Sequence, residues 1–217
     1  MTNDALRASG TQYQVVFVNQ SDIAGNACIY QQDPNLIMPD MFSLVWLAQA
    51  AKTTVVIFQW SIDYCFVWAH TGQLVPGIVF SASQVFPANL STTNEVTFDK
   101  INGEYTFKNR AAGPTQGSLF IKETTNIPLN DAAVGIGMSG RGTFVVQAQP
   151  NINLDFTPQP EYWIAFGNYV QGEVIEPSQM SGQAQISFPP NVYSMTATFN
   201  PDYTWTIEPT TTTPGVE

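Results

Sequence analysis

The chain has 217 residues, of which 11% are charged and 12% aromatic, and its 17 Asp and Glu outnumber seven Lys and Arg. The resulting net charge of −10 argues against nucleic acid and anionic membrane surfaces as partners, because both are bound through clustered cations. Little charge with many aromatic residues is also the opposite of a disordered composition. We therefore expect a folded protein with a surface made mainly of Thr, Asn, Gln and Ser, which suits dense packing or contact with sugars.

The N-terminal residues, Met-Thr-Asn-Asp-Ala-Leu-Arg, lack the basic start and the apolar core of a signal peptide. No apolar run reaches the roughly 18 residues of a membrane-spanning helix. We therefore predict a cytoplasmic protein, with export by an unconventional route left open. Cys28 and Cys65 lie in apolar, strand-like stretches, so we expect two buried reduced thiols, and a disulfide between them stays an alternative.

The predicted elements of the first half of the chain are strands. Residues 1–11 are expected to form a flexible leader. Runs of β-branched and aromatic residues between turn residues predict strands at 13–18, 27–31, 53–59, 63–69 and 78–80. The segment 40–51 fits either a helix capped by Asp40 or a buried strand, because periodicity does not settle short apolar runs. Its neighbours favour a strand.

The clearest local signal is a hairpin around Asn102-Gly103, which joins predicted strands at 95–101 and 104–108. Asn-Gly suits the two positive φ angles of a type I′ turn, whose twist matches that of paired strands. Apolar residues alternate with polar ones in both strands, which predicts one buried and one solvated face. The residues of the buried face would be Val96, Phe98, Tyr105 and Phe107.

The second half of the chain continues the same pattern. Strands are predicted at 117–122, 142–149, 162–166, 172–175, 185–188, 194–199 and 203–208. A turn at Asn200-Pro201-Asp202 joins the last two into a hairpin, and residues 210–217 are expected to be a disordered tail. Many short strands between turns predict an all-β fold, an antiparallel, jelly-roll-like β-sandwich with little or no helix. Without repeats or linkers, 12–209 is predicted to be one domain.

One motif resembles a nucleotide-binding signature but lacks its context. The segment 135–140 matches G-x-G-x-x-G, which binds dinucleotides when a strand precedes it and a helix follows. Here 128–131 suggests a loop and 143–147 a strand. We expect instead a glycine-rich loop or bulge where backbones pass closely. Arg141 in that loop is the cation placed to hold a ligand or a neighbouring subunit.

Catalytic and metal-binding patterns do not emerge. His70 is the only histidine, so any Ser-His-Asp or Cys-His device would need it, and its position predicts a surface residue at a strand end. One His and two Cys are too few for a four-ligand zinc site, and the acids show no calcium-binding loop. We predict no catalytic residue, metal or cofactor, although a pair of glycosidase-type carboxylates stays open among 17 acids.

The aromatic residues are the remaining functional candidates. Most of the five Trp and eight Tyr are expected in the core, but an exposed ring beside polar side chains would suit the C–H face of a sugar. The candidate ligand-binding residues are Tyr162, Trp163, Tyr203 and Trp205, together with Arg141.

Several segments resemble the bacterial rhizosphere-induced protein (RhiA) family. They are QWSIDY at 59–64, VGIGMSG at 134–140, GTFVVQAQPN at 142–151 and FPPNVYSMTA at 188–197, and the resemblance extends from about Tyr13 to Ile207. It implies a protein abundant in the bacterial cytosol, linked to plant association and quorum-regulated expression. It carries over no catalytic residue.

The leading interpretation is a non-enzymatic, self-associating or structural protein. Many strands and neutral polar side chains favour pairing of edges or faces, and homo-oligomers are the commonest assemblies. The alternative is a carbohydrate-binding, lectin-like module. An enzyme is a third class, which would need a concave pocket with converging polar groups.

Overall fold

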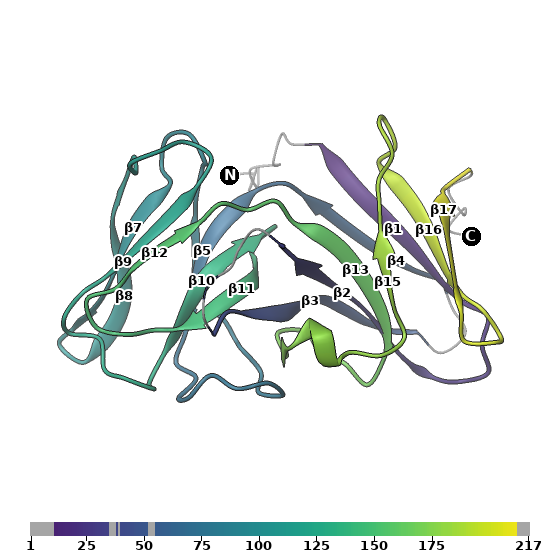
Figure 1. The fold of residues 1–217 in the computed structure, drawn as a ribbon, viewed down its shortest axis with the longest axis horizontal. Helices are drawn as coiled ribbons and strands as arrows, with labels where there is room; N and C mark the ends of the chain where they lie inside the picture. The colour runs from purple at the N-terminus through teal and green to yellow at the C-terminus, as the bar shows by residue number, and fades with distance from the viewer. Residues whose placement is uncertain (1–10, 35–37, 39, 52–54, 212–217) are drawn as a thin grey trace, which may run out of the picture.

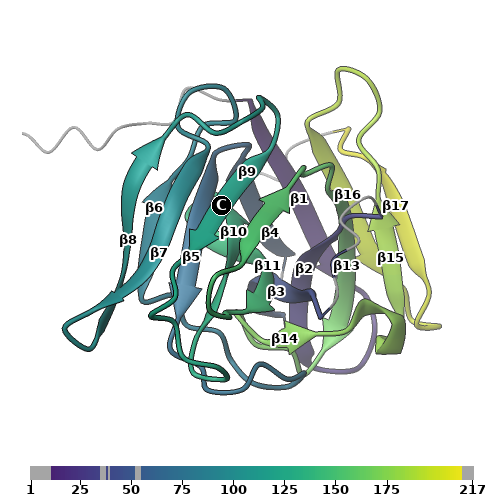
Figure 2. The ribbon, with the colours of Figure 1, turned by 60° about the vertical axis from the view of Figure 1, so that its left-hand side comes forward.

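The computed structural model describes residues 11–34, 38, 40–51 and 55–211. Within these residues the chain is almost entirely β-strand, and the only helix is the short 3-10 helix η1 (Pro177–Gln179). Three sheets pack together in a sandwich-like arrangement (Figures 1 and 2). Nearly all strand pairs are antiparallel, the exceptions being β1–β16 and β7–β9. The predicted all-β, antiparallel, sandwich-like fold is therefore confirmed, with three sheets.

The terminal sheet contains the first and last strands of the described chain. In spatial order its strands are β17 (Trp205–Pro209), β16 (Ser194–Phe199), β1 (Gln12–Asn19) and β4 (Val55–Ser61). The terminal hairpin predicted at the turn Asn200-Pro201-Asp202 is the β16–β17 pair.

The central sheet is the largest. In spatial order its strands are β15 (Gln183–Ile186), β13 (Glu161–Gly167), β2 (Gly25–Gln32), β3 (Phe42–Ala51), β11 (Arg141–Gln147), β10 (Ala133–Met138), β5 (Tyr64–Ala69) and β6 (Gln84–Pro87), with β14 (Val174–Ile175) paired to β3. The ambiguous segment at 40–51 is thus a strand, as its neighbours indicated.

The lateral sheet lies at the opposite end of the molecule from the terminal sheet (Figure 1). In spatial order its strands are β12 (Asn153–Phe156), β9 (Leu119–Glu123), β7 (Glu95–Ile101) and β8 (Glu104–Ala111). The predicted hairpin is β7–β8, with φ of 53° at Asn102 and 90° at Gly103. These two positive φ angles are those that the Asn-Gly sequence predicted.

The core has two main parts, both on one face of the central sheet. The terminal sheet covers the half with β2 and β13, around Phe17, Trp46 and Trp60. The lateral sheet covers the half with β5 and β10, around Phe66 and Phe98. Tyr64 packs against both clusters. The central sheet is therefore the platform that holds the other two sheets in place.

Two sequence predictions about strands were wrong. Segment 78–80 is not a strand: Val79 forms only an isolated bridge with Glu173. The predicted loop at 135–140 instead contains most of β10, a strand that the glycines concealed. A Cβ atom at Gly135 would lie 1.9 Å from the Phe144 carbonyl oxygen, so glycine is required where the backbones approach. A bulge between Ile136 and Gly137 accompanies this approach, as the bulge interpretation expected.

Further differences concern chain ends and short strands. Strands β6 and β12 were not predicted. The predicted leader at 1–11 and tail at 210–217 fall almost wholly outside the described residues, and the single-domain boundary at 12–209 stays a prediction. Within the part of the chain that the structure describes, no helix is long and apolar enough to span a membrane.

Candidate functional site

A cavity of about 520 Å³ opens where the terminal sheet meets β13 and β15 of the central sheet. We call it the tyrosine cavity. Its lining residues come from four separate stretches of the chain: Tyr13, Ile62, Tyr64, Gln159, Pro160, Glu161, Tyr162, Gln185, Ile186, Ser187 and Phe188. This volume lies within the range of small-molecule sites, roughly 300–1,000 Å³.

Aromatic rings form the wall of the cavity. The centroid of the Tyr13 ring lies 5.0 Å from that of Phe188, and the Tyr162 centroid lies 6.0 Å from the same ring, both edge-to-face. Tyr162 also packs 5.1 Å from Trp60. Such contacts fix the ring orientations, so the wall is preorganised rather than formed by mobile side chains.

The phenols of Tyr64 and Tyr162 stay protonated at neutral pH. Burial raises the pKa of Tyr64 to about 12, and burial likewise raises the pKa of Tyr162. The Tyr162 hydroxyl lies 3.8 Å from the Met138 sulfur, a weak acceptor. Both hydroxyl groups are therefore neutral hydrogen-bond donors.

The rim is polar and carries no positive charge among the described residues that line it. Glu161 supplies a carboxylate, while Gln159, Gln185 and Ser187 supply neutral donors and acceptors. Aromatic faces next to such groups suit a neutral ligand with an apolar face and several hydroxyl groups.

The structure separates Tyr162 from Trp163, because neighbouring strand residues point to opposite faces. The Trp163 ring packs on the other side of the central sheet, against the cluster of Cys28, Tyr30 and Ala165. Its indole nitrogen is buried and has no hydrogen-bond partner in the described residues. Of these two candidates, only Tyr162 lines the tyrosine cavity.

The second pair of aromatic candidates also lies outside the cavity. The half-buried Trp205 ring packs 5.0 Å from Phe199, and its nitrogen donates a hydrogen bond of 2.9 Å to the Gly182 carbonyl oxygen. Tyr203 is exposed, and its hydroxyl donates to Asp22 over 3.0 Å. The two residues therefore join surface segments to the terminal sheet.

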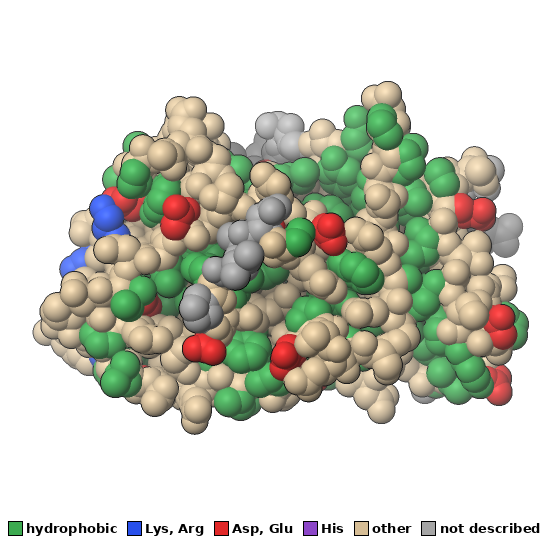
Figure 3. Space-filling model, in the orientation of Figure 1, with side chains coloured by type: hydrophobic (Ala, Val, Ile, Leu, Met, Phe, Trp, Pro, Cys, Tyr) green, Lys and Arg blue, Asp and Glu red, His purple; other side chains and the backbone are tan. Residues whose placement is uncertain are grey.

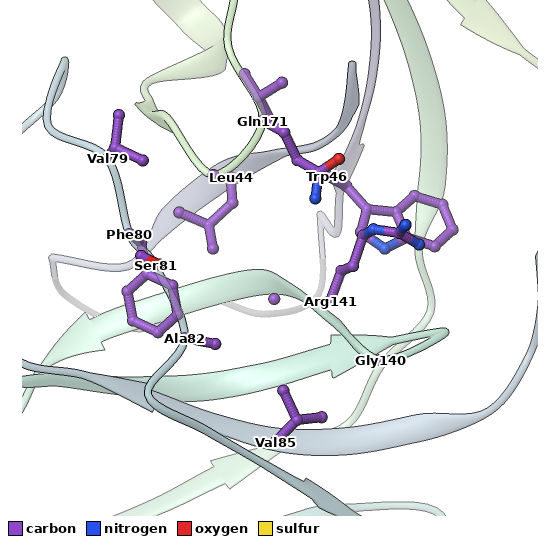
Figure 4. Close-up of a pocket in the computed structure, with 13 residues that line it drawn as sticks. Leu44, Trp46, Val79, Phe80, Ser81, Ala82, Val85, Gly140, Arg141 and Gln171 are labelled. Carbon is purple, nitrogen blue, oxygen red and sulfur yellow. The ribbon is translucent and has the colours of Figure 1, made fainter. Parts of the chain in front are cut away.

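Arg141 stands at the start of β11, after the turn formed by Ser139 and Gly140, whose φ angles are 51° and 73°. It lines a second cavity, separate from the tyrosine cavity (Figure 4). The five sequence candidates therefore do not form one site. Sequence reasoning missed Tyr13, Tyr64 and Phe188, for which the only available signal was an aromatic residue near a strand end.

His70 belongs to a hydrogen-bonded cluster around Asp131. His70 is exposed, and its Nε2 lies 2.7 Å from an Asp131 oxygen. Asp131 also accepts hydrogen bonds from Tyr105 and from Lys100 at 2.5 and 3.0 Å. These contacts, with that from Tyr105 the strongest, hold the pKa of Asp131 well below its usual range. The cluster ties the lateral sheet to the segment before β10.

The two thiols are buried and unpaired. Burial raises the pKa of both Cys28 and Cys65 to about 12, so they remain protonated and are poor nucleophiles at neutral pH. Across the described ranges, no group of three or more His, Cys, Asp or Glu could hold a metal ion.

These features define an all-β protein in which three sheets arrange aromatic and neutral polar side chains around open cavities. The chain belongs to the RhiA family, because the family model matches residues 10–210. Protein RhiA from Rhizobium leguminosarum bv. viciae is 38% identical over 209 residues, which cover 94% of this chain and 90% of that protein. The resemblance seen in the sequence is confirmed. No solved structure matches the chain.

Proposed function

We propose that this RhiA-family member is a non-enzymatic, self-associating structural protein whose copies meet through the outer face of the terminal sheet. The observation that carries the proposal is the nearly uncharged outer face of this sheet. Strand alternation places Phe17, Phe58 and Met195 on its inner face. The outer face carries Gln14, Val18, Val55, Ile57, Gln59, Ser194, Thr196, Thr198, Thr206 and Glu208, whereas Val16, which points the same way, is fully buried.

Hydrogen bonds order this outer face from β4 across β1 and β16 to the residue that follows β17. Gln59 donates to Gln14 over 2.8 Å, and Gln14 donates to Ser194 over 3.3 Å. Ser194 donates to Thr210, just beyond β17, over 2.9 Å. Side chains that are already ordered lose less conformational entropy when a partner docks. The ladder therefore prepares the face for contact with another flat surface.

Electrostatics favour this face over others for contact between identical copies. The net charge of −10 makes copies repel one another wherever carboxylates would meet. Glu208 is the one charged residue on the outer face among the described residues of these four strands. Two copies can therefore approach here with little repulsion, and added salt strengthens association by screening the remaining charge.

The non-enzymatic part of the proposal rests on the state of the reactive residues. Cys28 and Cys65 are buried thiols with raised pKa values. In the described part of the chain, the His70 imidazole hydrogen-bonds to Asp131 rather than to a serine or cysteine. Neither arrangement provides an activated nucleophile.

Self-association is tested by light scattering behind size exclusion across a concentration series. Ile57→Glu places a charge on the outer face in the middle of β4, and we expect it to reduce the associated fraction at least tenfold. Ile101→Glu makes the same change on an exposed residue of the lateral sheet and should leave association unchanged. A wild-type protein that stays monomeric at high concentration would falsify the proposal.

Carbohydrate binding is the second candidate function, and the tyrosine cavity favours it. Tyr13, Tyr162 and Phe188 offer ring faces for a sugar, beside the amide of Gln185. On a glycan array, we expect binding that Gln185→Ala weakens, since this exposed rim residue contributes little to folding. Tyr203→Ala, an aromatic change outside the cavity, should have no effect. A folded protein that binds no glycan would remove this candidate.

The family also motivates two proposals about biology. We propose a cytoplasmic location in a bacterium, and expression that follows plant association and cell density. Cell fractionation and a transcriptional reporter measured across growth density test them directly. Protein found mainly outside the cells, or a reporter indifferent to density, would contradict the corresponding proposal.

A further inference from the structure

Positive charge is scarce in this protein, and all but one of the cations in the described residues have partners. Lys100 pairs with Asp131, Lys108 with Asp99, and Lys122 with Glu95. Arg110 donates to the Pro87 carbonyl oxygen and lies over the Phe86 ring. On the face shown in Figure 3, the Lys and Arg side chains gather over the lateral sheet.

Arg141 differs from these four cations. Within the described residues its guanidinium has no ion pair, side-chain hydrogen bond or ring contact. In a chain with 17 acids, an unpaired guanidinium retains all five of its N–H donors for an external group.

Arg141 is exposed, and it lines two cavities. One has a volume of about 280 Å³, and a smaller one of about 100 Å³ lies between β3 and β4. Arg141 and Gln171 line both cavities, so they stand where the two meet. None of the described residues that line either cavity is acidic. The electrostatic environment therefore favours an anion at this place.

Most of the other side chains that line the larger cavity are apolar. Figure 4 shows Leu44, Val79, Phe80 and Ala82 around the space next to Arg141. Polar side chains are limited to Ser81 and Gln171, besides Arg141 itself. A ligand that fits these walls has an apolar body of modest size and one charged end.

We propose that this cleft binds a small monocarboxylate, with the carboxylate on Arg141 and an aliphatic or aromatic body against Leu44, Val79 and Phe80. A guanidinium fork matches a carboxylate with two parallel hydrogen bonds. One guanidinium balances one negative charge, whereas a phosphate dianion would be better balanced by two cations. The larger cavity shares no lining residue with the outer face of the terminal sheet or with the tyrosine cavity.

Calorimetric titration of the full chain with benzoate tests the proposal, with benzamide as the uncharged compound of the same shape. We expect saturable binding of benzoate and at least tenfold weaker binding of benzamide. Arg141→Gln should weaken benzoate at least tenfold and leave benzamide unchanged. Arg141→Lys, which keeps the charge but loses the fork, should give an intermediate loss.

Two further variants distinguish binding of benzoate in the cleft from general electrostatic attraction to the protein. Arg110→Gln removes the other described arginine and should not change benzoate binding. Ala82→Phe fills the cavity from an exposed position and should weaken benzoate and benzamide alike. Circular dichroism of each variant verifies folding. Three outcomes would each overturn the proposal. They are no saturable binding of benzoate, equal binding of benzoate by Arg141→Gln and wild type, and tighter binding of phosphate than of benzoate at Arg141.

Discussion

The terminal and lateral sheets cover the same face of the central sheet, but their polar side chains are organised differently. In the lateral sheet several charged residues form ion pairs, Asp99 with Lys108 and Glu95 with Lys122. In the terminal sheet the corresponding surface carries the neutral ladder of Gln59, Gln14 and Ser194. One covering sheet is thus fixed by its own ion pairs, while the other offers a nearly uncharged face to solvent.

The comparison teaches that similar cores support different surfaces. Both sheets bury large aromatic residues against the central sheet, so hydrophobic burial alone does not distinguish them. The difference lies in where carboxylates are placed. In an acidic protein, a face with few carboxylates is the place where identical copies meet with least repulsion.

The largest expected effect comes from removing one core ring under each covering sheet. Phe17 and Phe98 are fully buried, and Phe→Ala at such sites costs about 3–5 kcal/mol of unfolding free energy. We expect both variants to lose stability by this amount. If 12–209 is one domain, urea unfolding followed by circular dichroism and tryptophan fluorescence will show a single coincident transition in each.

That experiment also tests whether the two sheets are energetically separate. A Phe98→Ala variant with two transitions, one of them unchanged from wild type, would show that the lateral sheet unfolds independently. The single-domain prediction would then be wrong.

A smaller loss is expected from the buried charge of the lateral sheet. Burial alone would raise the pKa of Asp99, but hydrogen bonds from Lys108, Thr124 and Asn126 outweigh it and lower the pKa to about 2. Asp99→Ala should cost about 3 kcal/mol, because breaking a buried pair leaves unmatched polar groups. Chemical denaturation at pH 7 measures the loss.

The sign of the pH dependence follows from this lowered pKa. The Asp99 carboxylate stabilises the fold fully above the unfolded-state pKa of about 3.9, and this contribution is lost as pH falls through about 2. Wild type should therefore lose more stability than Asp99→Ala between pH 4 and 2. Equal losses of unfolding free energy in wild type and Asp99→Ala would contradict the lowered pKa of Asp99.

For Glu123, in the same sheet, we expect the opposite pH dependence of stability. Burial raises its pKa to about 8, against a weaker lowering by the Gln149 amide. Because the pKa is raised, the buried Glu123 does not reduce stability below the unfolded-state pKa of about 4.3. The stability of the fold then falls as pH rises from there towards 8. Glu123→Gln should remove this fall and stabilise the protein at pH 8 by about 1–2 kcal/mol. Thermal unfolding at pH 5 and pH 8 compares the two proteins.

The local sequence was sufficient to predict some strands and turns but not others. The β7–β8 hairpin could be predicted because Asn102-Gly103 determines its turn locally. Strand β10 could not, since Gly135 and Gly137 lower strand propensity. Glycine is required at these two positions because the backbones of Phe144 and Arg141 lie close to them, and this approach exists only after the strands pair.

The candidate site shows the same division. Tyr162 was named from its type and its neighbours, and strand alternation alone could have separated it from Trp163. The cavity itself could not be predicted, because Tyr13, Tyr64 and Phe188 converge on Tyr162 only through the packing of two sheets. Likewise, an arginine without a partner is recognised only once the positions of the acids are known.

The smallest expected effect tests the neutral ladder itself. Gln14→Ala removes the residue that links Gln59 to Ser194, and exposed neutral hydrogen bonds contribute about 0.5–1.5 kcal/mol each. Because the groups left behind remain solvated, the loss of unfolding free energy should be about 0.5 kcal/mol. Without Gln14, the side chains of Gln59 and Ser194 are free and must be ordered again when a second copy docks. If the ladder prepares the face for docking, the free energy of self-association should therefore fall by more than the free energy of unfolding. Light scattering and urea unfolding of the same preparation separate the two quantities, and unchanged association would mean that absence of charge, rather than order, governs the contact.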